Sequence, residues 1–232
     1  DYDSLSIKNP GLIYASISGF GQDGPLADRP GFDQIAQGMG GLMSITGEPG
    51  RGPMRVGIPI ADLCAGLFAA QAIFIALLER SKSGKGQWVQ TSLLQAQAFM
   101  LDFQAARYLM DGDVPKQAGN NHPTSIPTGV FKTSDGFINL AVAGELIWKR
   151  LAETLERPEW CDDERFAINE SRSQNRDLLN AEIEKITRTQ TSTFWVDKLN
   201  DAGVPAGDIN DIDQVFQSPQ IQHLGLAQTM TS

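Results

Sequence analysis

The sequence predicts an α/β domain followed by a smaller α+β domain. In the first half, two short runs of β-branched and aromatic residues flank a long apolar helix, the order expected of a parallel α/β unit. In the second half, a hairpin pattern precedes several amphipathic helices. Hydrophobic residues make up 41% of the 232 residues and charged residues 20%, so the chain has the composition of a folded protein with a buried core.

Glycine and proline mark the limits of the elements in the first half. A strand is predicted where an apolar run stands between Pro10-Gly11 and Gly19, and the long helix is predicted to end near Gly84. A loop rich in glycine and proline follows the first strand. The predicted elements are strands at residues 12–18 and 87–91 and helices at residues 32–43, 62–81 and 93–110.

A change of composition separates the two halves. Glycine, proline and asparagine gather between residues 111 and 125, which predicts a linker or a long functional loop. Beyond it, Ser134-Asp135 predicts the turn of a hairpin. The predicted elements of the second half are strands at residues 129–133 and 136–142 and helices at residues 146–156, 174–188 and 192–202.

Charge and cysteine content restrict the possible partners. The net charge of −9 disfavours nucleic acid, because phosphate binding needs clustered cations and the basic cluster at residues 80–85 is short. Cys64 and Cys161 predict no disulfide framework, so a reducing compartment is the simpler interpretation. The apolar run at residues 63–78 falls short of the about 20 residues that span a bilayer, which predicts a buried helix and no membrane partner.

Three patterns suggest cofactor sites, and their context argues against each. Residues 19–24 read G-x-G-x-x-G, but Pro25 and Pro30 stand where a dinucleotide-binding helix would run. Residues 84–86 lack the spacing of a phosphate-binding P-loop. His122 and His223 are far apart and lack neighbouring ligands at metal-site spacing, so we expect no metal.

Asp62 is the most informative residue in the sequence. It stands where a proline- and glycine-stiffened segment, residues 55–61, enters the long helix. The local sequence alone favours a helix N-cap, which stabilises a helix by about 1 kcal/mol. A carboxylate at the mouth of an apolar helix can instead be a reactive group.

An ordered series of motifs gives this second interpretation its weight. The series is Gly19-Phe20-Gly21-Gln22-Asp23-Gly24-Pro25, Gly31-Phe32-Asp33, Gly40-Gly41-Leu42-Met43, Asp62 with Gly66, and Lys82-Ser83-Gly84-Lys85-Gly86-Gln87. Together these motifs resemble the family III CoA-transferases, also called the CaiB/BaiF family. The resemblance extends through residues 160–166 and 203–207 and covers essentially the whole chain.

The resemblance implies a fold and a domain plan. It implies an incomplete Rossmann-like large domain plus a smaller α+β domain, the CoA-transferase family III fold, with the chain a central fragment of a longer protein. Residues 1–111 would be part of the CoA-binding and catalytic domain, residues 112–125 a linker, and residues 126–207 the small domain. Residues 208–232 would start the return to the large domain. An interlocked homodimer of the full-length protein is also implied.

The resemblance also implies an activity. Asp62 matches the catalytic nucleophile of a transferase that moves coenzyme A from an acyl-CoA to a small carboxylic acid through aspartyl anhydride and aspartyl-CoA thioester intermediates. Coenzyme A would be a substrate, and neither ATP nor a metal would be needed. The loop that touches coenzyme A in the family and the glycine-rich turns predict the CoA-binding residues Gly21, Gln22, Arg29, Pro30, Gly31, Phe32, Asp33, Gly40 and Gly41.

Two alternatives stay open. The same fold is known in α-methylacyl-CoA racemases, where the matching segment reads Gly-His-Asp, whereas Phe32 stands here in place of the proton-carrying histidine. Glu145, near a glutamate of the racemases, is a possible second carboxylate. Alternatively, the chain is an inactive, truncated acyl-CoA-binding domain. A cytoplasmic location is expected, or the mitochondrial matrix in a eukaryote. Arg55 and His122 are candidates to meet a dicarboxylic acceptor.

Overall fold

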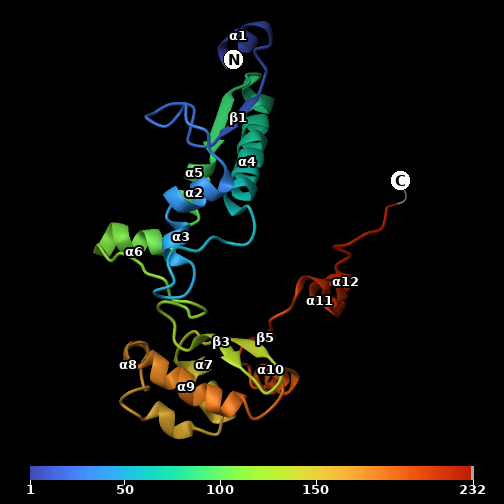
Figure 1. Cartoon of the computed structure of the whole chain (residues 1–232). Coiled ribbons are helices and arrows are strands. Elements are labelled where there is room, and N and C mark those ends of the chain that lie inside the picture. Colours follow the sequence, from blue (N-terminus) through green and yellow to red (C-terminus); the bar gives the residue numbers. More distant parts are fainter. Residues whose placement is uncertain (231–232) are drawn as a thin grey trace. The chain divides into compact units, whose positions relative to one another are not determined.

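The long helix α4 (Ile60–Ser83) organises the first half of the computed structural model, which describes residues 1–230 (Figure 1). The chain divides between Gly119 and Asn120 into two compact units, each with its own core. In the first unit, strand β1 (Tyr14–Ser18) pairs in parallel with β2 (Trp88–Ser92). Because α4 lies between two parallel strands in the sequence, the predicted α/β class is confirmed for this unit.

Shorter helices surround this strand–helix–strand core. They are α1 (Tyr2–Lys8), α2 (Asp33–Met39), α3 (Leu42–Ile45), α5 (Leu93–Phe99) and α6 (Phe103–Asp111). Two predicted helices are each divided in the structure. The helix predicted at residues 32–43 breaks at Gly40 and Gly41, and Gly41 has a left-handed φ of 84°. The helix predicted at residues 93–110 breaks before Asp102, whose φ is 49°.

Helix α4 buries only its face of small side chains. Its buried residues are Ala61, Cys64, Ala65, Ala69 and Ala76. Its large residues face outward: Leu67, Phe74, Ile75 and Leu78 are each more than 60% exposed among the described residues. The prediction of a buried helix therefore holds for one face. The helix is long and apolar enough to cross a membrane, but one such helix is weak evidence of a span.

The second unit is an antiparallel sheet covered by helices. Strands β3 (Thr128–Lys132), β4 (Phe137–Ala141) and β5 (Ala206–Asp208) lie in that order. The predicted hairpin and three predicted helices are present, the helices as α7 (Glu145–Thr154), α9 (Arg176–Thr187) and α10 (Ser192–Asp201). Strand β5, the 3₁₀ helix η1 (Pro158–Cys161) and helices α8 (Asn169–Gln174), α11 (Ile212–Gln217) and α12 (Pro219–His223) were not anticipated.

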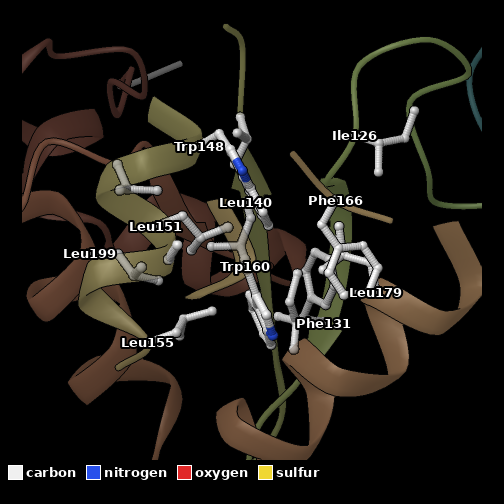
Figure 2. Close-up of a cluster of buried hydrophobic side chains, with 14 of the residues drawn as sticks. Ile126, Phe131, Leu140, Trp148, Leu151, Leu155, Trp160, Phe166, Leu179 and Leu199 are labelled. Carbon is white, nitrogen blue, oxygen red and sulfur yellow. The ribbon is translucent and has the colours of Figure 1, made fainter. Parts of the chain in front are cut away.

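Aromatic residues fill the core of the second unit (Figure 2). The rings of Trp148 and Trp160 stack with centroids 6.1 Å apart and planes inclined by 6°. Phe166 meets the face of Trp160 edge-on at 6.1 Å. This apolar cluster joins the sheet to helices α7, α9 and α10, so the second unit has a continuous core of its own.

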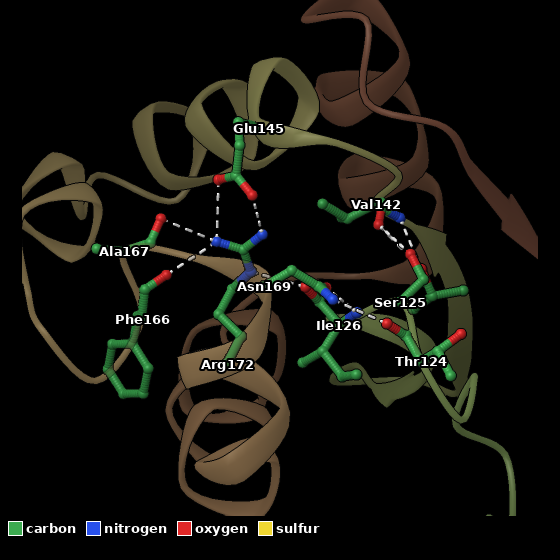
Figure 3. A network of polar contacts seen from close by, with 10 residues as sticks. Thr124, Ser125, Ile126, Val142, Glu145, Phe166, Ala167, Asn169 and Arg172 are labelled. Atoms are coloured by element: carbon green, nitrogen blue, oxygen red, sulfur yellow. Dashed lines mark hydrogen bonds and ion pairs between the residues drawn. The ribbon is translucent and has the colours of Figure 1, made fainter. Parts of the chain in front are cut away.

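A buried arginine connects two loops and the start of α7 (Figure 3). The side chain of Arg172 is 1% exposed and forms an ion pair of 2.8 Å with Glu145. Its Nε donates to the carbonyl oxygen of Ile126 at 2.8 Å, and its Nη1 donates to that of Phe166 at 2.9 Å. The guanidinium carbon lies 4.8 Å from the ring centroid of Trp148. Every donor group thus has a partner, as a buried cation requires.

We expect Arg172→Ala to lower the free energy of unfolding by about 3 kcal/mol or more, because several buried carbonyl groups would lose their donors. Urea unfolding followed by tryptophan fluorescence measures this change. Arg188→Ala is the matched control, since Arg188 is about half exposed and pairs with Glu184 on the surface. The control should change stability by less than about 1 kcal/mol. Equal losses in the two variants would contradict the interpretation.

Candidate active site

Asp62 lies in the first turn of α4 and not at its cap. The helix begins at Ile60, with Pro59 as the N-cap residue, and Asp62 is therefore the third helical residue. The N-cap predicted from local sequence is wrong because the helix starts two residues earlier. Pro59 carries no side-chain cap hydrogen bond, so this helix start needs a partner from elsewhere in the fold. The side chain of Asp62 is left unused by capping.

Asp33 supplies that partner from another helix. Its Oδ1 accepts a hydrogen bond of 2.9 Å from the backbone N–H of Ala61. Asp33 opens helix α2 and is 7% exposed. A buried carboxylate next to unpaired helix N–H groups is stabilised both by the hydrogen bond and by the helix dipole. The start of α4 is thus fixed by a residue 28 positions earlier in the chain.

Gln37 completes this arrangement, and the sequence interpretation missed it. The residue is fully buried, and its Nε2 donates to Oδ2 of Asp33 at 2.7 Å and to the carbonyl oxygen of Ile58 at 3.2 Å. Its Oε1 accepts from the backbone N–H of Val56 at 2.9 Å. The available signal was the Asp–Gln spacing of four residues, at which side chains on one helix meet.

The electrostatic environment changes the acidity of Asp62. Partial loss of hydration, and after it the negative charge of Asp33, raise the pKa of Asp62 above its ordinary value. The guanidinium of Arg55 lies 3.9 Å from Oδ2 of Asp33 and is close to half exposed. Asp62 is itself an exposed residue in this unit. The first unit therefore presents the carboxylate of Asp62, with increased basicity, at its surface. The nearby carboxylate of Asp33 is buried and hydrogen-bonded at both oxygens.

Small residues let the surrounding helices approach this position closely. Ala36 of α2, Ala61 of α4 and Leu93 of α5 form one buried cluster. A Cβ atom on Gly40 would lie 2.7 Å from the carbonyl oxygen of Ala36 and closer still to Gln97. Gly41 lines a groove of about 390 Å³ between α3, α5 and α6. Gly40 is therefore required by packing, and Gly41 is favoured by its left-handed backbone conformation, with a φ of 84°.

The predicted CoA-binding loop lies in the same unit. Gly19 and Gly31 cross so tightly that a Cβ atom on either would lie 2.7 Å from the Cα of the other, which holds both ends of the loop together. Gly21 has a φ of 118° and donates its N–H to the Ser18 hydroxyl at 3.0 Å. The side chains predicted to contact the ligand are mostly exposed, namely those of Gln22, Arg29, Pro30 and Phe32.

Two candidate residues belong to the second unit and are engaged there. Glu145 is the partner of Arg172. Nδ1 of His122 accepts hydrogen bonds from the backbone N–H groups of Thr124 and Ser125, at 3.2 and 3.0 Å. Within residues 1–230, no group of three or more His, Cys, Asp or Glu side chains is arranged to hold a metal ion.

The comparison with known proteins identifies the family. The model of CoA-transferase family III matches residues 1–232. The chain belongs to CoA-transferase family III. The resemblance inferred from the motifs is thereby confirmed.

Relatives and solved structures agree with this assignment. The chain is 43% identical over 230 residues to a succinate–glutarate CoA-transferase of Agrobacterium fabrum, covering 97% of this chain and 56% of that protein. It is 37% identical to an acetyl-CoA:oxalate CoA-transferase of Acetobacter aceti, covering 95% of the chain and 57% of that protein. A CaiB/BaiF family protein from Brucella suis has a TM-score of 0.82 at 41% identity, covering 97% and 60%. The predicted fold is confirmed, and the chain spans little more than half the length of these proteins.

Replacing Asp33 by asparagine should lower the pKa of Asp62. The substitution removes the repulsion that helps to raise this pKa, while an amide oxygen can still accept from Ala61. A carbon-13 NMR titration of the aspartate carboxyl groups measures the effect. Asp3→Asn makes the same charge change at an exposed position of the first unit and should leave Asp62 unshifted. A pKa that stays constant or rises in Asp33→Asn would refute the coupling.

Proposed function

We propose that the protein transfers coenzyme A from an acyl-CoA to a small carboxylic acid, with Asp62 as the nucleophile. The observation that carries this proposal is the carboxylate of Asp62, presented in the first turn of α4 with a raised pKa and no capping role. Membership of CoA-transferase family III supplies the reaction class. The activity is proposed for the whole protein, because the chain spans 56% and 57% of the two relatives described above.

The first half of the reaction moves coenzyme A onto Asp62. An oxygen of the carboxylate attacks the thioester carbonyl of the acyl-CoA, the carbon–sulfur bond breaks, and the CoA thiolate leaves. The product is a mixed anhydride between Asp62 and the acyl group. The thiolate then attacks the aspartyl carbonyl, releases the donor acid as a carboxylate, and forms an aspartyl-CoA thioester.

The second half repeats these steps with the acceptor. The acceptor carboxylate attacks the aspartyl-CoA thioester and displaces the thiolate, which gives a second anhydride. The thiolate attacks the acceptor side of this anhydride, forming the new acyl-CoA and restoring the carboxylate of Asp62. No net proton or electron is exchanged.

The residues around Asp62 suit these requirements. A more basic carboxylate is a better nucleophile, so the raised pKa of Asp62 favours its attack on the thioester. Asp62 lies in the first turn of α4, where the helix dipole favours the negative charge that develops in a tetrahedral intermediate. Anhydrides hydrolyse, so the reaction requires that water be excluded from the site.

The names of the relatives favour a dicarboxylic acid as the acceptor. The relatives described above are named for glutarate and oxalate, and others for mesaconate and citramalate. Arg55, with its half-exposed guanidinium beside Asp33, is the candidate to bind the second carboxylate of such an acid. The homodimer and the cytoplasmic or matrix location stay predictions from the family resemblance.

Trapping of the covalent intermediate tests the proposal. The complete protein is incubated with succinyl-CoA, treated with hydroxylamine, digested and analysed by mass spectrometry. We expect a hydroxamate at Asp62 and its complete loss in Asp62→Ala. Asp177→Ala, which changes an exposed aspartate of the second unit, should keep the adduct. Glutarate added as the acceptor should yield glutaryl-CoA only in the variants that form the adduct.

The other outcomes point to the two alternatives. Native protein that binds CoA, forms no hydroxamate and exchanges the α-proton of a 2-methylacyl-CoA with deuterium oxide would be a racemase. We do not expect that result, because Phe32 stands where the racemases have a histidine. Its side chain is 76% exposed and has no group that can carry a proton. An absence of CoA binding in calorimetry would contradict both enzymatic functions.

A further inference from the structure

Two buried side chains hold the segment that leads into α4. Gln37 binds the segment at two points, and Asp33, to which Gln37 donates a hydrogen bond, binds it at a third. Gln37 accepts from the N–H of Val56 and donates to the carbonyl of Ile58, and Asp33 accepts from the N–H of Ala61. These contacts span residues 56–61, the six residues immediately before Asp62. We call this set of hydrogen bonds, together with the Asp33–Gln37 bond, the Gln37 clamp.

We propose that Gln37 is a positioning residue for the reaction at Asp62. Gln37 fixes residues 56–61 and thereby holds the carboxylate of Asp62 in one position at the start of α4. The inference rests on the proposed function, because it assigns Gln37 a part in the step that Asp62 performs. Gln37 itself is fully buried and is not a catalytic residue.

The geometry favours Gln37 over the other buried groups as the controlling element. Residues 56–59 of this segment belong to no strand or helix, so their peptide groups lack the regular hydrogen-bond pattern that would otherwise fix them. Gln37 also orients Asp33, because its amide donates to the carboxylate oxygen that Ala61 does not use. The loss of Gln37 would therefore loosen both the approach and the cap.

The helix that carries Gln37 is a rigid base for this role. Ala36, its neighbour in α2, packs in the same buried cluster as Ala61. The last turn of α2 is closed by a hydrogen bond of 2.7 Å from the backbone N–H of Gly40 to the carbonyl oxygen of Ala36. A displacement of about 1 Å at a reacting group can reduce a rate by about 100-fold, so a support of this kind affects catalysis strongly.

The test compares Gln37→Met with Gln97→Met in the complete protein. Both residues are fully buried glutamines of the first unit, and methionine has a similar shape. Gln37 makes the clamp, whereas the side-chain amide of Gln97 has no hydrogen-bond partner in the described part of the chain. The pair therefore separates the clamp from the general effect of removing a buried amide.

Two measurements are made on each variant. Hydrogen exchange monitors the backbone amides of Val56 and Ala61, and hydroxylamine trapping with succinyl-CoA gives the rate of adduct formation and its KM. For Gln37→Met we expect faster exchange at both amides, a rate about 10- to 100-fold lower, and a KM within about 3-fold of the native value. Gln97→Met should keep the native exchange and a rate within about 3-fold.

Each other result overturns a distinct claim. Unchanged exchange at Val56 and Ala61 in Gln37→Met would show that the clamp does not hold the segment. Faster exchange with an unaltered adduct rate, or equal rate losses in both variants, would remove the positioning role while leaving Asp62 as the nucleophile. No hydroxamate in the native protein would instead overturn the proposed function, and with it any catalytic role for Gln37.

Discussion

The arrangement around Asp62 depends on one hydrogen bond, from the N–H of Ala61 to the buried carboxylate of Asp33. Each group would be costly to bury alone, because a helix N–H without an acceptor and a carboxylate without donors both lose their hydration. Pairing them removes both costs and orients α4 relative to α2. It also places a second negative charge near Asp62, so the interaction that builds the helix start also raises the pKa of the proposed nucleophile.

The second unit also pairs a buried charge with buried backbone groups, but there the charge is positive. Arg172 is a buried cation surrounded by carbonyl oxygens and one carboxylate, and it fixes residues from three separate segments. Asp33 is a buried anion surrounded by N–H donors. In both units a buried charge pairs with backbone groups that no helix or strand hydrogen bond satisfies: carbonyl groups of loops in the second unit, and an N–H in the first turn of α4 in the first. An apolar residue of similar size in place of Arg172 would leave several main-chain carbonyl groups without this donor, and one in place of Asp33 would leave the N–H of Ala61 without its acceptor.

The sequence predicted the main elements because their signals are local. Periodicity located α4 and the strands, and Gly84, with a φ of 72°, ends α4 where predicted. The division of residues 93–110 was missed, since apolar spacing does not report a backbone turn such as that at Asp102. The motif resemblance identified Asp62 as the candidate nucleophile, but it did not identify Gln37, which supports the segment before Asp62. Gln37 reads as an ordinary polar helix residue until the fold brings residues 56–58 against it.

The smallest side chains decide where the reactive carboxylate can be. Leu67, Phe74, Ile75 and Leu78 of α4 are exposed, while Ala61 and Ala65 lie in buried clusters with residues of α2 and α5. A hydrogen bond from the backbone N–H of Ala61 to the short side chain of Asp33 requires the two helices to approach more closely than leucine or phenylalanine would allow. A larger residue at position 36 or 61 would therefore move Asp62 without touching it. The position of the Asp62 carboxylate is thus set by the packing of alanine residues, which no functional motif identifies. Functional motifs alone therefore do not define the site.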